Sequence, residues 1–175
     1  MRRGGGKQKG KAYTKKVAKI LSKAFWGRDD YLHETHGSGS LSKHKASYWT
    51  GDIAPLTDVP FPLHVEVKKG YGAWDLIKIL RVYKRPHTFL DFWFQCLRDR
   101  TNKKRQPYLL LVVGKDNDTD YAVFSKKVFS LLKRKKDLNY IKVVKWYRRK
   151  KYTFYVCLLE KFLERFSIRN RVTGG

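Results

Sequence analysis

The chain has 175 residues, which is enough for one domain with a modest core and too few for two of ordinary size. Its 40 Lys and Arg against 15 Asp and Glu give a formal charge of +25, so nucleic acid is the leading partner and an anionic membrane surface the second. The two cysteines exclude a disulfide framework and a cysteine-based zinc site. We find neither a membrane-spanning apolar run nor a secretory signal, so we expect a cytoplasmic protein, in a nucleoid or viral replication context, that binds DNA or RNA and no membrane.

The N-terminal part of the chain is strongly basic. Residues 1–11 hold Arg, Lys and Gly without an apolar side chain after Met1, which predicts a flexible basic arm. Apolar residues then recur at helical spacing, with lysines on the remaining face, which predicts an amphipathic helix over 12–25. Residues 31–36 alternate as a short strand does, and the Gly-Ser-Gly-Ser stretch at 37–40 ends it.

The clearest strand runs from Leu63 to Lys68, where apolar residues alternate with His64, Glu66 and Lys68 on the opposite face. An element opens before it at Gly51-Asp52. Beyond it, the patterns predict helices at 72–83, 87–99 and 125–132, a buried strand at 108–113 with a hairpin partner at 121–124, a basic tract at 133–152, and a final segment, 154–166, that is apolar at helical spacing.

This order of elements predicts an α/β fold with a central mixed β-sheet flanked by helices. We divide the chain into a flexible arm (1–11), a core domain (12–132) and a basic C-terminal extension (133–175). The extension is expected to pack on the core or on a dimer partner.

Two carboxylates and one amine stand out as candidates for chemistry. The strand period places Glu66 and Lys68 on one face, about 7 Å apart. If Asp52 starts an adjacent strand, it joins them, and hard oxygen ligands of this kind hold Mg²⁺. The Val67 carbonyl could add a further ligand. A bound metal would activate water against a phosphodiester, with Lys68 positioning that water or stabilising the developing charge. The alternative is a solvated Glu-Lys pair that occurs by chance in a lysine-rich chain.

Gly51-Asp52 followed by Glu66-Val67-Lys68 resembles the PD-(D/E)xK nuclease core, with Gly in place of the usual Pro. Lys9-Gly10 and the 37–40 segment are similar to elements of archaeal-type Holliday junction resolvases, and the resemblance covers roughly residues 8–125. It implies a restriction-endonuclease-like core and a homodimer. It also implies Mg²⁺-dependent sites, in which Mn²⁺ could substitute, that make paired nicks in a four-way DNA junction.

Carried over to this chain, the resemblance makes Asp52, Glu66 and Lys68 the metal-binding and catalytic residues and places Ser38 near the scissile phosphate. The Glu that the family has on its first helix is missing here. Glu34 is the nearest acidic candidate to replace it, the alternative being a carboxylate paired with surface lysines. Gln95 and His36 are weighed as residues that flank the site, against an ordinary exposed role.

The basic segments are expected to contact phosphates without reading sequence. Two other interpretations stay open: a PD-(D/E)xK nuclease that acts on linear duplex DNA, and a non-catalytic basic protein that binds nucleic acid. The residues that we assign to DNA binding are Arg2, Arg3, Lys7, Lys9, Lys11, Lys15, Lys16, Ser40, Lys43, Lys45 and Lys69.

Overall fold

The computed structural model describes residues 5–35, 49–56, 59–69, 89–100, 104–114, 119–133, 135–147 and 149–166. The helix predicted at 72–83 lies outside these residues. The elements, in chain order, are α1 (Gly5–Trp26), β1 (Leu32–Glu34), β2 (Ile53–Pro55), β3 (Leu63–Lys69), α3 (Phe89–Asp99), β4 (Tyr108–Gly114), β5 (Tyr121–Ser125), α4 (Lys126–Leu131), the short 3-10 helix η2 (Lys135–Asp137), β6 (Ile141–Tyr147), β7 (Lys150–Leu158) and α5 (Leu159–Arg165).

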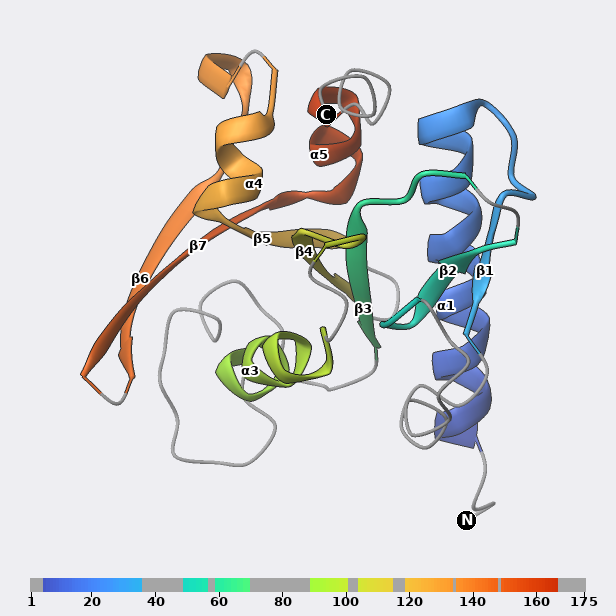
Figure 1. Cartoon of the computed structure of the whole chain (residues 1–175), viewed down its shortest axis with the longest axis horizontal. Coiled ribbons are helices and arrows are strands. Elements are labelled where there is room, and N and C mark those ends of the chain that lie inside the picture. The colour runs from blue at the N-terminus through green and yellow to red at the C-terminus, as the bar shows by residue number, and fades with distance from the viewer. Residues whose placement is uncertain are drawn as a thin grey trace.

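The central sheet is mixed, as the sequence predicts. Its five strands lie in the order β3-β4-β5-β7-β6, with β3 and β4 parallel and the other neighbours antiparallel. β1 and β2 form a separate antiparallel pair beside α1 and β3 (Figure 1). Since β3 is the first strand of the sheet, its outer edge is open to groups from the β2 side.

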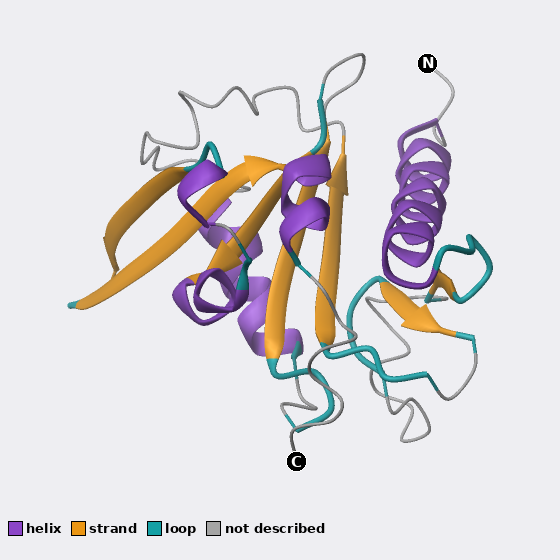
Figure 2. Ribbon diagram, turned by 90° about the horizontal axis from the view of Figure 1, so that it is seen from above, coloured by secondary structure: helices purple, strands orange, loops and turns teal. Residues whose placement is uncertain are grey.

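Helices cover both faces of the sheet (Figure 2). One face carries α1, α4 and α5, whose Leu21, Val128 and Phe162 share a core with Val65 and Phe124 of the strands. The opposite face carries α3. Its buried Phe92, Trp93 and Cys96 pack in a second core with residues of β4 to β7. The chain therefore has three layers, and the polar face of β3 lies on the α3 side.

The helix α1 begins at Gly5, which corrects the prediction of a flexible arm up to residue 11. The apolar stripe that starts at Tyr13 anchors the helix, and each further helical residue adds one backbone hydrogen bond at little cost. Asp120, at the start of β5, holds this part of α1: the Tyr13 hydroxyl donates to its carboxylate at 2.7 Å, and Lys16 pairs with it at 3.2 Å.

The C-terminal region is part of the central sheet rather than an extension packed on it, which corrects the predicted domain division. β7 pairs with β5 from Tyr121↔Leu158 to Ser125↔Phe154, inside the sheet. The predicted helix over 154–166 is also wrong in its first part, because β7 continues to Leu158. Both faces of β7 are buried here, so its apolar run shows no alternation that would distinguish a strand from a helix.

None of the helices in the part of the chain that the structure describes is both long enough and apolar enough to span a membrane.

Candidate functional site

The outer edge of β3 holds the residue that precedes β2. The Asp52 amide donates to the Val65 carbonyl at 2.8 Å, and the Val67 amide donates to Asp52 Oδ2 at 2.8 Å. Alternate residues of a strand turn their backbone groups to the same side, so the Val67 carbonyl faces the edge where Asp52 lies. Asp52 and the Val67 backbone therefore meet at this edge.

Gly51 allows this approach. Its φ of +99° lies in a region that side-chain-bearing residues rarely adopt, and a Cβ there would stand 2.6 Å from the Val65 carbonyl oxygen. Proline, which the motif usually has at this position, requires φ near −65°. Gly51 therefore gives the backbone before Asp52 a path that proline could not follow.

A buried polar network fixes the segment before Asp52. Gln106 is fully buried, accepts hydrogen bonds from the Thr50 amide (2.9 Å) and hydroxyl (2.8 Å), and donates to the Thr50 and Leu63 carbonyls. The Thr50 hydroxyl also contacts His64 Nδ1 at 2.9 Å. The Thr50 hydroxyl donates its single proton to Gln106, so it can only accept from His64, and Nδ1 of the ring carries the proton in this contact. Sequence patterns did not indicate a role for Gln106 or Thr50.

His64 belongs to the same face of β3 as Glu66 and is completely buried. Its Nε2 has no hydrogen-bond partner among the described residues. Burial, assisted by the nearby Arg100 charge, lowers the pKa of His64 to about 4. The ring is therefore neutral at pH 7 and serves as part of the polar support behind the two carboxylates.

Glu66 and Lys68 form a close ion pair next to Asp52. Lys68 Nζ lies 2.6 Å from Glu66 Oε1, and the two side chains are 14% and 5% exposed. Burial, followed by the repulsion of Asp52, raises the pKa of Glu66 to about 7 in spite of Lys68. For Lys68, burial acts in the opposite direction, but the two carboxylates outweigh it and raise the pKa, so the amine stays protonated.

The helix α3 covers this cluster. The Phe92 ring lies 5.2 Å from Lys68 Nζ, a cation–π contact that keeps the amine beside Glu66. Burial raises the pKa of the Cys96 thiol well above its usual range, which leaves it unsuited to act as a nucleophile. Gln95 is half-buried on the same helix, one residue before Cys96, and its role beside the site stays a prediction.

The cluster fits a divalent cation chemically. Two carboxylates and a backbone carbonyl are hard oxygen donors. Burial and then the repulsion of Asp52 raise the pKa of Glu66, and a bound cation would offset that repulsion. Within the described residues no group of three or more His, Cys, Asp and Glu side chains could hold a metal ion. The donors present are thus two carboxylates with a carbonyl, and further ligands would be water or a phosphate oxygen.

Glu34 does not join this group. It is buried on β1, and its carboxylate lies 3.5 Å from the amine of Lys11 and 3.7 Å from that of Lys15 on α1. The structure therefore shows the alternative considered for it, a carboxylate paired with lysines.

The predicted DNA-binding residues are only partly described. Lys9, Lys11, Lys15 and Lys16 are exposed on α1, and Lys69 Nζ lies 4.8 Å from the Tyr13 ring. Lys9 and Gly10 lie inside α1 and not before it. The remaining predicted DNA-binding positions, whose side chains lie outside the described residues, are Arg2, Arg3, Lys7, Ser40, Lys43 and Lys45. Ser38, predicted near the scissile phosphate, and His36, predicted to flank the site, also lie outside the described residues.

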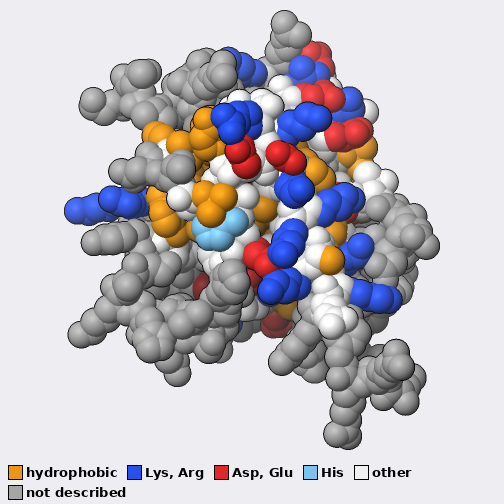
Figure 3. Space-filling model, turned by 90° about the vertical axis from the view of Figure 1, so that its right-hand side faces the viewer, with side chains coloured by type: hydrophobic (Ala, Val, Ile, Leu, Met, Phe, Trp, Pro, Cys, Tyr) orange, Lys and Arg blue, Asp and Glu red, His pale blue; other side chains and the backbone are white. Residues whose placement is uncertain are grey.

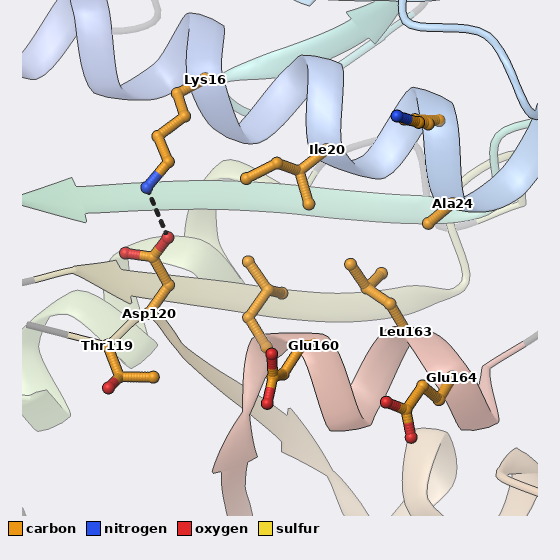
Figure 4. Close-up of a pocket in the computed structure, with 10 residues that line it drawn as sticks. Lys16, Ile20, Ala24, Thr119, Asp120, Glu160, Leu163 and Glu164 are labelled. Atoms are coloured by element: carbon orange, nitrogen blue, oxygen red, sulfur yellow. Dashed lines mark hydrogen bonds and ion pairs between the residues drawn. The ribbon is translucent and has the colours of Figure 1, made fainter.

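A groove of about 700 Å³ lies elsewhere, between α1 and α5 (Figure 4). Ile20 and Leu163 form part of its apolar floor, and Lys16 and Glu164 stand at its sides. Asp52, Glu66 and Lys68 are not among its lining residues. It is therefore separate from the carboxylate cluster.

One comparison with known proteins identifies a family for this chain. The family model described as "Phage putative PDDEXK endonuclease" matches residues 5–171. The match therefore includes both β3 and the C-terminal strands. No curated protein and no solved structure matches the chain.

Proposed function

This chain belongs to the phage putative PDDEXK endonuclease family, and we propose that it hydrolyses DNA phosphodiester bonds at Asp52, Glu66 and Lys68 with Mg²⁺ as cofactor. The family places it among endonucleases of the PD-(D/E)xK type, which act on DNA and typically use divalent metals. The observation that carries the site assignment is the buried Glu66–Lys68 pair, with Asp52 anchored beside it on Val67.

Each residue has a separate task in this proposal. Asp52 and Glu66 supply oxygen ligands, and the Val67 carbonyl supplies a third. A bound Mg²⁺, or Mn²⁺ in its place, lowers the pKa of a water molecule and offsets charge on the scissile phosphate. The Lys68 ammonium, held by Glu66 and Phe92, donates hydrogen bonds to the attacking water or to a phosphate oxygen. α3 and the sheet keep bulk water from the buried side of the cluster.

Asp52→Asn and Glu66→Gln test the site. Each keeps the side-chain size but removes a charge, so cutting of plasmid DNA in Mg²⁺ should fall by on the order of 10²-fold or more, with little change in DNA affinity. Glu160→Gln, which neutralises an exposed carboxylate on α5, is the matched control and should cut like the unmodified chain. Equal cutting by all three variants would refute the assignment.

We propose further that the substrate is a four-way DNA junction, cut by a homodimer. The support is the similarity of the 37–40 segment to archaeal-type Holliday junction resolvases. Symmetric resolution also needs two sites, one for each of two opposed strands, and a dimer supplies them. The size of the positive charge suits recognition of a branched shape through phosphates.

A labelled immobile junction and a linear duplex of matched sequence distinguish the substrates. The proposal predicts paired nicks on opposed strands of the junction, a much slower rate on the duplex, and a dimer by sedimentation. Equal rates would indicate an endonuclease for linear DNA instead.

A further inference from the structure

The β6–β7 hairpin extends beyond the rest of the sheet (Figures 1 and 2). β7 pairs with β5 only from Phe154 onward, whereas β6 and β7 stay paired as far as Tyr147↔Lys150. Residues 144–147 and 150–153 therefore pair only with one another. We name this two-stranded projection, with its turn, the ribbon (144–153).

The ribbon concentrates positive charge that the described residues do not neutralise. Residues 144–153 contain five Lys and Arg and no Asp or Glu. Arg149, Lys150 and Lys151 are exposed at and beside its turn, and none forms an ion pair with a described carboxylate. A concentration of like charges on a narrow two-stranded element is typical of a surface that meets a polyanion.

Several lysines of α1 differ in this respect. Lys15 lies near Glu34, Lys16 near Asp120 and Lys19 near Asp29, each within 4 Å of a carboxylate oxygen. Figure 3 shows the α1 side of the molecule, where acidic side chains lie between the basic ones. Internal pairing reduces the counterion release that each α1 lysine can contribute, so α1 is a weaker candidate for the main phosphate contact than sequence alone indicates.

The ribbon is held in a fixed relation to the carboxylate cluster by α3. The Tyr152 ring, in the ribbon, contacts Phe94 edge-on at 5.0 Å, and Phe154 at its base contacts Trp93 at 4.7 Å. The same helix contacts Lys68 through Phe92. The helix α3 thus contacts both the ribbon and the site.

We propose that the ribbon binds the phosphates of duplex DNA away from the scissile bond, an inference that rests on DNA as the substrate of the proposed function. In the sheet, Glu66 of β3 pairs with Leu111 of β4, and Leu111 pairs with Val123 of β5. Val123 in turn pairs with Val156 of β7, so Glu66 and Val156 lie three strand spacings apart on one line across the sheet. Three strand spacings make about 14 Å, and the six residues from Val156 to Lys150 make about 20 Å. The turn is then about 24 Å from Glu66, or roughly seven base pairs of duplex.

The salt dependence of DNA binding tests the contact. The ribbon variant is Arg149→Asn, Lys150→Gln and Lys151→Gln, with Asn chosen because it tolerates the positive φ of 62° at position 149. The control variant, Lys126→Gln, Lys133→Gln and Lys136→Gln, removes the same charge from exposed positions on and after α4. Binding of a 30-base-pair duplex is followed by fluorescence anisotropy in Ca²⁺, from low to high salt.

The ribbon variant should reduce the slope of log affinity against log salt by about 2.7, since each phosphate contact contributes about 0.9. It should also weaken binding at least tenfold at moderate salt, while the control changes little. Equal slopes for the two variants would overturn the proposal. The proposal would also be overturned if the ribbon variant lost binding to anionic lipid vesicles but kept the unmodified chain's slope of log DNA affinity against log salt.

A cross-linker places the contact on the DNA. The native Cys96 and Cys157 are buried, so Lys150→Cys can be labelled selectively with a photoreactive group, and Lys126→Cys is the control. Cross-links from position 150 should fall roughly seven base pairs from the nick. If the labelled chain cuts DNA but forms no such cross-links, the ribbon contact is contradicted. If it forms the cross-links but shows no Mg²⁺-dependent cutting, the proposed function is contradicted and the ribbon contact stands.

Discussion

At the scale of single residues, the site depends on how Gly51 and Asp52 approach β3. Asp52 is bound at both ends, through its amide to Val65 and through its carboxylate to the Val67 amide. Both contacts are possible only because nothing larger than hydrogen occupies the Gly51 α-carbon on the β3 side. The position of one ligand is therefore set by backbone contacts.

Gly51→Ala should displace Asp52. A Cβ at 2.6 Å from a backbone oxygen cannot be accommodated by a side-chain movement, and the positive φ adds strain. We expect a loss of about 1–3 kcal/mol in the free energy of unfolding, with cutting reduced well beyond the change in stability.

Gly27→Ala is the matched control for this substitution. Gly27 also has a positive φ, 78°, at the end of α1, but a Cβ there would meet nothing within 4 Å. It should lose comparable stability in urea unfolding and keep its cutting rate. Normal cutting by Gly51→Ala would show that the close approach of Asp52 is not needed.

The lowered pKa of His64 predicts that the folded chain loses stability in acid. Its pKa is about 4 in the folded chain and near 6.5 when unfolded, so the unfolded state takes up a proton first as the pH falls. The stability due to neutral His64 is complete above pH 6.5 and is lost as the pH falls through 4, by roughly 3 kcal/mol. Urea unfolding from pH 7 to 4 should show a shallower pH dependence in His64→Gln, and identical slopes would contradict the burial of a neutral ring.

Residue patterns predicted part of this site. Alternation on β3 placed Glu66 and Lys68 on one face correctly, because strand geometry alone fixes that relation. It also placed His64 there. The solvated face considered as the alternative is not what the structure shows, since α3 covers a buried face. Gln106 could not be identified, since it lies 56 residues from Thr50 in the chain and only the fold brings the two together.

At the scale of elements, the segment from Thr50 to Asp52 lies along the outer edge of β3, and hydrogen bonds from Gln106 hold it there. The side-chain amide of Gln106 accepts a hydrogen bond from the Thr50 amide and donates to the carbonyls of Thr50 and of Leu63 on β3. Gln106→Leu would leave these buried groups without partners, at a cost of about 1–3 kcal/mol for each unsatisfied group. The cutting rate should fall at least tenfold, and more Mg²⁺ should be needed for half-maximal cutting, with DNA affinity unchanged.

Leu132→Ala is the control for Gln106→Leu. Leu132 is a buried core residue that follows α4, and its truncation should cost about 2–5 kcal/mol by leaving a cavity. At temperatures where both variants are folded, Leu132→Ala should keep the normal Mg²⁺ requirement. If the two variants cut alike, Gln106 contributes only stability and does not position Asp52.

Two elements show where local patterns were insufficient. The apolar stripe of α1 predicted the helix, but not its extension to Gly5, because lysine and glycine alone favour a flexible chain. Such an extension is supported by pairing with distant carboxylates, as between Lys11 and Glu34. For β7, burial on both faces removed the alternation that identifies a strand.

At the scale of the whole molecule, the C-terminal quarter of the chain completes the fold. β7 lies between β5 and β6, and Phe154 and Phe162 are almost completely buried in the two cores. A chain ending at residue 132 should therefore not unfold cooperatively in urea and should expose enough apolar surface to bind a hydrophobic dye. A cooperative transition in that fragment would support the division drawn from the sequence.

The most direct measurement is a crystal structure of the chain grown with Mn²⁺, in which anomalous scattering locates the ion. The account predicts one strong peak within about 2.0–2.4 Å of oxygens from Asp52, Glu66 and the Val67 carbonyl, with Lys68 beside it. The same peak should be absent in Glu66→Gln. A structure in which Mn²⁺ binds elsewhere, or in which Glu66 remains paired with Lys68 and no ion lies between it and Asp52 at saturating Mn²⁺, would contradict the central claim.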